Sequence, residues 1–138
     1  TSWSERAFIG LAESDDLATN VWVDKGMVVC SEPDGVKSYV RNGSNDWEAY
    51  FKFNAIDPSF IQTPEGDQYL IYGSWHSGIV AVKLNPATGK PYQLKTLSDY
   101  GTRIASRSPT SRWQGSEGPE IIYNPDTQYY YLFMAILN

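Results

Sequence analysis

The sequence predicts an all-β protein, and two observations support that prediction. Helical periodicity is nearly absent along the 138 residues, whereas short strand-like runs recur between clusters of turn-forming residues. Aromatic residues make up 14% of the chain, and aromatic side chains suit the half-buried, pleated surface of a sheet. We therefore expect a fold built from short hairpins.

The first strands are expected near the beginning of the chain. Ala7–Ala12 is predicted to be a strand that ends in the turn residues Ser14–Asp16. Val21–Val23 is predicted to be a second short strand. The residues Asp24–Gly26 are then expected to turn the chain into the run Met27–Cys30.

A second unit begins with the strand-like run Ala55–Ile61. The turn cluster Thr63–Asp67 connects this run to the next, Gln68–Ser74. A third run, Gly78–Leu84, follows, and Tyr92–Leu97 is predicted to pair beside the unit as an outer strand.

The last third of the chain repeats the second unit. An acid close to a proline, a turn and an aromatic strand recur in the same order, and 60 positions separate both Asp57 from Glu117 and Gln68 from Gln128. Strand, turn and strand repeated at this period are typical of propeller blades, although an ordinary antiparallel meander carries similar hairpins. The chain is therefore predicted to hold two or three blades, and a closed propeller needs at least four.

Charge and composition exclude several classes of partner. The formal net charge is −5 and no basic cluster is present, which argues against nucleic acid binding. No apolar run approaches the ~18 residues needed to cross a membrane. Cys30 is the only cysteine, so it cannot form an internal disulfide and is predicted to be a small buried hydrophobe. No group of residues has metal-ligand spacing, so no cofactor is identified in the sequence.

Two acids, Asp57 and Glu117, are the candidate catalytic residues. Acids at two separate strand ends suit glycoside hydrolysis, in which one carboxyl group donates a proton to the leaving oxygen and a second carboxylate completes the machinery. A carboxyl group in a poorly solvated cleft has a raised pKa, which would keep the proton on Glu117 at neutral pH. Taken singly, Glu117 is better explained as a surface residue near a turn, and Asp57 has the common explanation of a turn former before Pro58.

Three motifs, taken together and in order, resemble a known family. They are Asn54-Ala55-Ile56-Asp57-Pro58, then Tyr72-Gly73-Ser74-Trp75 with Gly78-Ile79 after it, and Glu117-Gly118-Pro119-Glu120-Ile121. In this order they are similar to glycoside hydrolase family 43, and most similar to its arabinanases. The resemblance extends from Ala7 to the final strand. It implies a five-bladed β-propeller, of which residues 1–138 would be a partial catalytic domain without the first and the closing blades.

The resemblance also assigns roles to five residues. Glu117 would be the general acid, and Asp57 would modulate its pKa and orient it. Asn54 and Ser74 would form hydrogen bonds with sugar hydroxyl groups, and Trp75 would be a platform on which a sugar ring stacks. On composition alone, core packing explains Trp75 equally well.

Two other parts of the family's machinery have no match in the sequence. The family's general base lies in the first blade, upstream of the matched region, and the early acids look like turn residues instead: Asp15, Asp16 and Asp24. Family members often hold an ion in the central channel through a histidine of a late blade, which has no counterpart here. The complete propeller could still hold a calcium ion.

The remaining aromatic and polar features receive weaker interpretations. Trp47 and Trp113 precede the two acidic motifs, where they either line sugar subsites or pack against a neighbouring blade. The polar stretch Glu32–Asp46 is expected to be a long surface loop. His76 is the only histidine, and no catalytic or metal-binding role is assigned to it.

The activity implied by the resemblance is that of an inverting endo-α-1,5-L-arabinanase acting on arabinan, secreted or in the cell envelope. This chain would supply the acid and its modulator, and another chain or segment would complete the propeller and supply the base. An exo-arabinanase, an arabinofuranosidase or a β-xylosidase of the same family is an alternative. A different class also stays open: a noncatalytic propeller fragment that binds carbohydrate or acts as an assembly unit.

Overall fold

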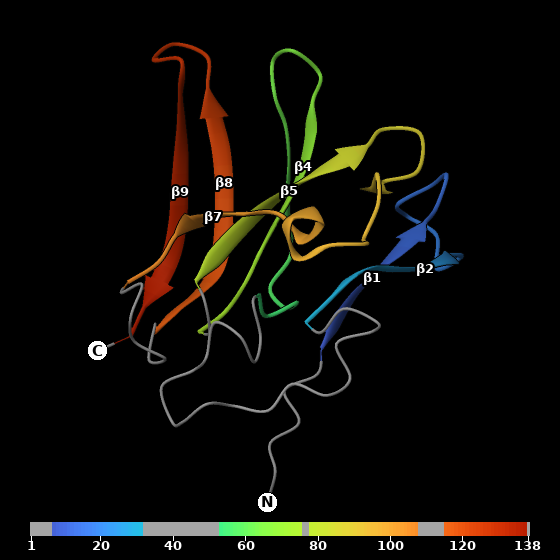
Figure 1. Cartoon of the computed structure of the whole chain (residues 1–138). Coiled ribbons are helices and arrows are strands. Elements are labelled where there is room, and N and C mark those ends of the chain that lie inside the picture. Colours follow the sequence, from blue (N-terminus) through green and yellow to red (C-terminus); the bar gives the residue numbers. More distant parts are fainter. Residues whose placement is uncertain (1–6, 32–52, 76–77, 108–114, 138) are drawn as a thin grey trace, which may run out of the picture.

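The computed structural model describes residues 7–31, 53–75, 78–107 and 115–137. These residues form three antiparallel sheets that stand side by side (Figure 1). The first sheet contains β1 (Phe8–Glu13) and β2 (Val23–Cys30), and the third contains β8 (Ser116–Asn124) and β9 (Tyr129–Ile136). The middle sheet contains β3 (Ser59–Gln62), β4 (Gln68–Tyr72), β5 (Ile79–Asn85), β6 (Lys90–Pro91) and β7 (Thr102–Ala105).

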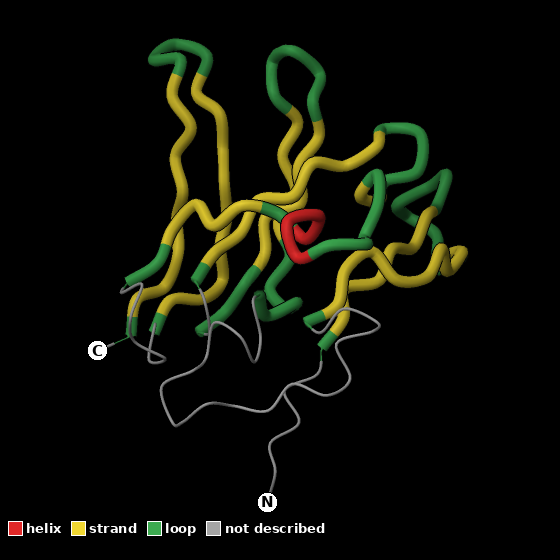
Figure 2. Tube along the Cα trace, in the orientation of Figure 1, coloured by secondary structure: helices red, strands yellow, loops and turns green. Residues whose placement is uncertain are grey.

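The predicted all-β class is confirmed. Within the described ranges, Figure 2 shows helix at a single short segment, the 3₁₀ turn Leu97–Tyr100. Nowhere in those ranges is a helix long and apolar enough to cross a membrane.

The first sheet differs from its prediction in β2, which begins at Val23, so Val21 and Trp22 do not form the separate strand that was predicted. Asp24–Gly26 was expected to reverse the chain, but these residues lie inside β2 and pair with β1. The register shifts between Leu11 and Ala12, so one residue of β2 is left over as a bulge. Gly26 adopts a φ of 78°, and its amide donates a hydrogen bond to Asp24 Oδ1 at 2.7 Å. The aspartate and the glycine therefore bend the strand locally without reversing it.

The outer edge of the middle sheet also differs from its prediction. Tyr92–Leu97 is not a strand; β5 pairs instead with the short β6 and with β7. Asp99 explains the difference, because its carboxylate accepts hydrogen bonds from the backbone amides of Thr96 (2.7 Å) and Lys95 (2.8 Å). These amides, that of Thr96 most of all, hold the pKa of Asp99 below its usual range. They fold the segment into a tight turn.

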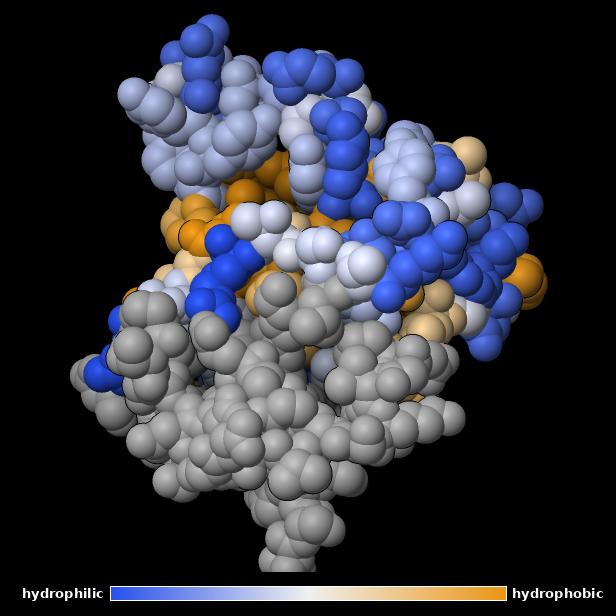
Figure 3. Space-filling model, viewed as in Figure 1, coloured by the Kyte–Doolittle hydropathy of each residue, from blue (hydrophilic) through white to orange (hydrophobic). Residues whose placement is uncertain are grey.

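The middle sheet is covered on both faces, and strand periodicity explains how. Alternate side chains of a strand point to opposite faces. Leu70 and Tyr72 of β4 belong to a cluster that includes Ile9, Val28 and Val29 of the first sheet. Ile71, on the other face of β4, belongs to a second cluster against which side chains of the third sheet pack: Ile121, Tyr123 and Met134. Figure 3 shows hydrophobic residues in the hollow between the third and middle sheets.

The third sheet repeats the beginning of the middle one, as the sequence predicted. The turn before Gln68 joins β3 to β4, and the turn before Gln128 joins β8 to β9. Both hairpins point the same way in Figure 1. The strands that follow Asp57 and contain Glu117 therefore occupy equivalent places in neighbouring sheets.

Candidate active site

The two predicted catalytic acids lie where neighbouring sheets meet. Asp57 immediately precedes Pro58 and β3, Glu117 is the second residue of β8, and these two strands contact each other. The backbone amide of Gly118 donates a hydrogen bond to Asp57 Oδ2 at 3.1 Å. A carboxylate of one sheet is thus joined to the residue that follows the second acid.

A bulge in β8 makes this hydrogen bond available. Glu117 pairs with Ala135 and Glu120 pairs with Phe133, so β8 has one more residue than β9 between these pairs. Gly118 occupies the bulge with a φ of 60°, a conformation that glycine adopts without steric cost. Pro119, which follows it, has no amide hydrogen to place in the ladder. The Gly118 amide therefore points away from β9 and reaches Asp57.

A second hydrogen bond joins the same two strands further along. The hydroxyl group of Ser59 donates to Glu120 Oε2 at 2.9 Å. Ser59 is buried, whereas Glu120 is exposed. These two contacts, one just before β3 and one at its first residue, therefore fix how β3 lies against β8 near the acids. Sequence reasoning assigned no role to either residue.

Glu117 is also held from the middle sheet, by the loop that follows β4. The indole Nε1 of Trp75 donates a hydrogen bond to Glu117 Oε2 at 3.0 Å, and Ser74 Oγ donates to the same oxygen at 3.4 Å. Ser74 is almost fully buried at 2% exposure, while Trp75 and Glu117 are half-buried. The carboxyl group of Glu117 is therefore within reach of solvent but has two fixed donors on one oxygen.

The backbone of this loop has an unusual conformation. Gly73 has a φ of 131°, and a Cβ atom there would lie 2.3 Å from the carbonyl oxygen of Gly78. Trp75 has a φ of 57°, which is rare for a bulky residue. Its amide donates to the carbonyl oxygen of Ser116 at 2.8 Å. Strained backbone of this kind persists where the surroundings fix it and is concentrated at functional sites.

The side chain of Asn54 forms a hydrogen bond with the backbone of the same loop. Its Nδ2 donates to the carbonyl oxygen of Ser74 at 2.9 Å, and its Oδ1 accepts from Ser31 Oγ at 3.3 Å. Ser31 Oγ in turn accepts from the Ala55 amide at 3.0 Å. The structure thus brings together all five predicted site residues, and places Asn54 and Ser74 in contact with each other. Their predicted hydrogen bonds to sugar stay a prediction.

Asp57 is itself in a conformation that its sequence context disfavours. A residue before proline is normally extended, but Asp57 has a φ of 54°. Aspartate tolerates the left-handed region better than most residues. The unusual backbone directs its carboxylate toward β8, which the prediction of a simple turn-forming role did not require.

Several other predictions are settled only in part. Trp47, Trp113, His76 and the loop Glu32–Asp46 lie outside the described residues. Asp16 accepts a hydrogen bond from the amide of Ala18, as a turn residue does, whereas Asp24 lies inside β2.

Among the described residues, no three His, Cys, Asp or Glu side chains are placed to hold a metal ion. A calcium ion in the complete propeller stays a prediction.

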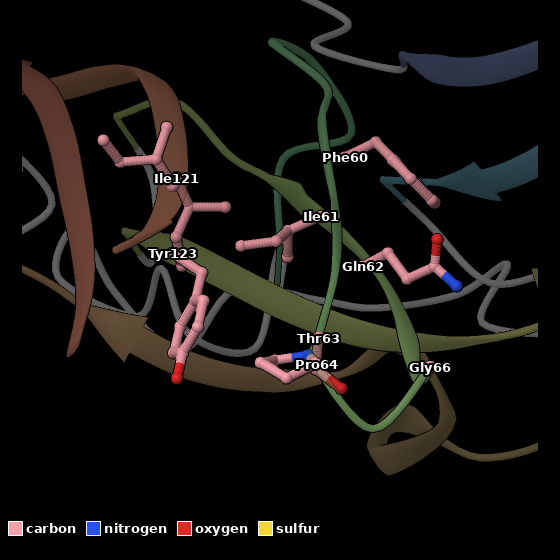
Figure 4. Close-up of a pocket in the computed structure, with 9 residues that line it drawn as sticks. Phe60, Ile61, Gln62, Thr63, Pro64, Gly66, Ile121 and Tyr123 are labelled. Atoms are coloured by element: carbon pink, nitrogen blue, oxygen red, sulfur yellow. The ribbon is translucent and has the colours of Figure 1, made fainter. Parts of the chain in front are cut away.

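An open groove of about 680 Å³ lies elsewhere on the molecule. It is lined by the far ends of β3 and β8 and by the turn after β3, and Figure 4 shows Ile61 directed toward Ile121 and Tyr123. Asp57 and Glu117 are at the opposite ends of these strands. The groove is therefore separate from the candidate site.

The arrangement of successive antiparallel sheets as neighbouring blades, with Asp57 and Glu117 where two of the blades begin, is that of part of a β-propeller. The chain belongs to glycosyl hydrolases family 43, because the model of that family matches residues 2–137. The predicted family and the predicted fold class are both confirmed.

Known members of the family are similar along nearly the whole chain. The chain is 37% identical to the extracellular endo-α-(1→5)-L-arabinanase of Thermotoga petrophila, over 98% of this chain and 27% of that protein. It is 31% identical to extracellular endo-α-(1→5)-L-arabinanase 2 of Bacillus subtilis, over 96% of this chain and 26% of that protein.

A solved structure supports the same conclusion. The crystal structure of the endo-1,5-α-L-arabinanase from Thermotoga petrophila matches with a TM-score of 0.71 and 33% identity, over 95% of this chain and 27% of that one. The chain thus spans about a quarter of the length of these relatives.

Proposed function

We propose that the complete protein containing this chain is a glycoside hydrolase that cleaves α-1,5-linked arabinan internally. The observation that carries the proposal is the joining of Asp57 to the Glu117 segment, across two blades, through the Gly118 amide. The relatives are named as extracellular endo-arabinanases, which supports both this substrate and secretion.

In this proposal the two acids have different roles. Glu117 donates a proton to the glycosidic oxygen as the bond to the leaving sugar breaks. Asp57 keeps Glu117 in place through Gly118 and adds negative charge beside it. A water molecule attacks the opposite face of the sugar, so the product has the inverted anomeric configuration. The base that activates this water lies on the part of the protein outside this chain.

The remaining predicted site residues are proposed to bind substrate. The face of the Trp75 ring offers a stacking surface for a sugar, and Asn54 and Ser74 line the same loop.

Among described residues, the outward face of the third sheet exposes four large side chains, Ile122, Tyr129, Tyr131 and Phe133. We propose that the next blade of the same protein covers them, because the relatives are about four times as long as this chain.

The proposed activity predicts the behaviour of a single substitution. In the complete protein, Glu117→Gln should lower turnover of linear arabinan by at least about 100-fold, because general acid catalysis typically contributes 10²–10⁴-fold. Reducing ends released per minute measure turnover, and NMR of the first product identifies its anomer. Glu65→Gln, at an exposed turn, is the matched control and should keep normal turnover.

The products separate the alternatives. Mixed oligosaccharides indicate internal cleavage, whereas a single short product indicates an exo-arabinanase; release of monomers from arabinosides or xylosides indicates the other members of the family. Normal turnover in Glu117→Gln would contradict the assignment of the acid. Binding of arabinan without any cleavage by the complete protein would favour the noncatalytic alternative.

A further inference from the structure

The contact between Trp75 and Glu117 links two blades at the acid itself. The side chain of Trp75 donates to Glu117 Oε2 at 3.0 Å, and its backbone amide donates to the carbonyl oxygen of Ser116 at 2.8 Å. Trp75, in the loop after β4, therefore donates hydrogen bonds to two consecutive residues of β8. Ser116 is fully buried, so the backbone hydrogen bond lies in the interior.

The backbone conformation of Trp75 shows that these two hydrogen bonds are accompanied by strain. A bulky residue with a φ of 57° is strained by about 1–2 kcal/mol relative to the ordinary conformation. A residue used only to fill space or to present a ring to solvent needs no such conformation. The strain is instead consistent with a side chain that must reach one particular atom.

We propose that Trp75 is a positioning residue whose indole N–H orients the carboxyl group of Glu117 for proton donation. The inference rests on the proposed function, in which Glu117 is the general acid. The indole N–H and the Ser74 hydroxyl occupy Oε2. The transferable proton is therefore on Oε1, the oxygen that these two donors leave available.

The same hydrogen bond changes strength during the reaction. The proton on Oε1 moves to the glycosidic oxygen as the bond from that oxygen to the anomeric carbon breaks, and Glu117 becomes a carboxylate. A hydrogen bond to a charged acceptor is roughly twice as strong as one to a neutral acceptor. The indole N–H thus stabilises the transition state more than the bound substrate, so its loss lowers kcat.

This role is separable from that of a sugar platform. A platform that stacks on the substrate contributes whichever leaving group departs. A residue that acts through the general acid matters only when the leaving oxygen needs a proton. A sugar alcohol is a poor leaving group and needs one, whereas 2,4-dinitrophenolate departs without it.

The test compares the two leaving groups in the complete protein. Trp75→Phe keeps a ring but removes the N–H donor. We expect its kcat on linear arabinan to fall by on the order of 10–100-fold, the loss of one hydrogen bond to a charged group. On a 2,4-dinitrophenyl arabino-oligosaccharide, kcat should change less than about threefold because no proton is required. Ser74→Ala should show the same pattern more weakly, since its contact is longer.

Two controls make the outcome interpretable. Trp22→Phe changes an exposed tryptophan in the segment between β1 and β2 and should leave both rates unaltered. The indole N–H resonance of Trp75, assigned by its absence in Trp75→Phe, should move in Glu117→Gln while that of Trp22 stays in place. This readout reports the contact without depending on activity.

The possible failures are distinguishable. Equal losses on both substrates, or a raised KM with unchanged kcat, would overturn the positioning role and leave a sugar platform. An indole resonance that does not respond to Glu117→Gln would overturn the contact. If the unmodified protein cleaves neither substrate, the proposed function itself fails, and the positioning role fails with it.

Discussion

The hydroxyl group of Tyr72 is a polar atom buried in the core between the first and middle sheets. The residue is fully buried, and its hydroxyl donates to the carbonyl oxygen of Tyr100 at 2.6 Å. Burial, followed by the nearby Tyr100, raises the pKa of Tyr72 well above its ordinary value of 10.0. The folded protein therefore holds this proton more tightly than the unfolded chain does.

This difference predicts a loss of stability in alkali. The stabilising effect of the Tyr72 proton is fully present below pH 10 and is lost as the pH rises above it, by up to about 1.4 kcal/mol per pH unit. In Tyr72→Phe, the free energy of unfolding should be lower at pH 8 by about 1 kcal/mol, because a buried hydrogen bond is missing. Its decline above pH 10 should be shallower.

Urea unfolding at pH 8, 10 and 11 measures both effects. Tyr129→Phe, at an exposed position of β9, is the control and should decline as steeply as the unmodified protein. An equally steep decline in Tyr72→Phe would show that this tyrosine does not contribute.

At the scale of elements, the loop after β4 depends on glycine at one position. In Gly73→Ala, the new Cβ would collide with the carbonyl oxygen of Gly78 in addition to the strain of a positive φ. We expect a loss of about 2–4 kcal/mol in the free energy of unfolding, since both costs add. Gly66 also has a positive φ, 89°, but a Cβ there meets nothing within 4 Å.

Gly66→Ala is therefore the matched control and should cost only about 1 kcal/mol, from the backbone strain alone. Midpoints of urea unfolding compare the two variants. Equal losses would mean that the close approach between Gly73 and Gly78 relaxes at little cost.

Strand existence was predictable from the sequence, and element boundaries were less so. The short runs Gln68–Ser74 and Gly78–Leu84, bounded by turn residues, predicted β4 and β5, because strands covered on both faces carry apolar residues at successive positions. The prediction of an outer strand at Tyr92–Leu97 was wrong. The Asp99 carboxylate binds backbone amides that a strand would have used, and periodicity does not reveal this competition. The bulge inside β2 was likewise predicted to be a turn, because aspartate and glycine, here Asp24 and Gly26, are common in bulges and in turns alike.

The residues of the candidate site were predictable as neighbours, but the contacts between them were not. Motifs identified Asp57 and Glu117, and the structure brings them to one place. The hydrogen bond from the Gly118 amide to Asp57 was not predictable from local pattern, although a proline inside a strand often marks a bulge. That Trp75 donates to Glu117 depends on packing between blades, which local patterns do not encode.

At the scale of the whole molecule, the three described sheets lie side by side, and no described sheet lies against the outward face of the third. The middle sheet has partners on both faces, whereas the outward face of the third sheet exposes apolar side chains, with Phe133 at 57%. Such surfaces associate in water because burial of apolar area is favourable. The 138-residue chain produced alone should therefore self-associate.

Light scattering at several protein concentrations measures the expected rise in mass. Phe133→Ser should reduce association, because it removes the largest apolar contribution from the middle of β9. Leu17→Ser changes another exposed apolar residue, outside the strands, and should not. A monomer at all concentrations would contradict the proposal that a further blade covers this face.

The β3–β4 and β8–β9 hairpins point the same way, so the candidate site and the hairpin turns lie at opposite ends of the strands. Asp57, Trp75 and Glu117 gather at one end of the strands, and the turns Thr63–Asp67 and 125–128 project from the other (Figure 1). Exposed turns of this kind accept inserted residues with little penalty. Natural variation can therefore accumulate there at little risk to the chemistry. An engineer can use the same turns to attach a dye, a tether or a second domain at the end of the strands opposite Asp57 and Glu117.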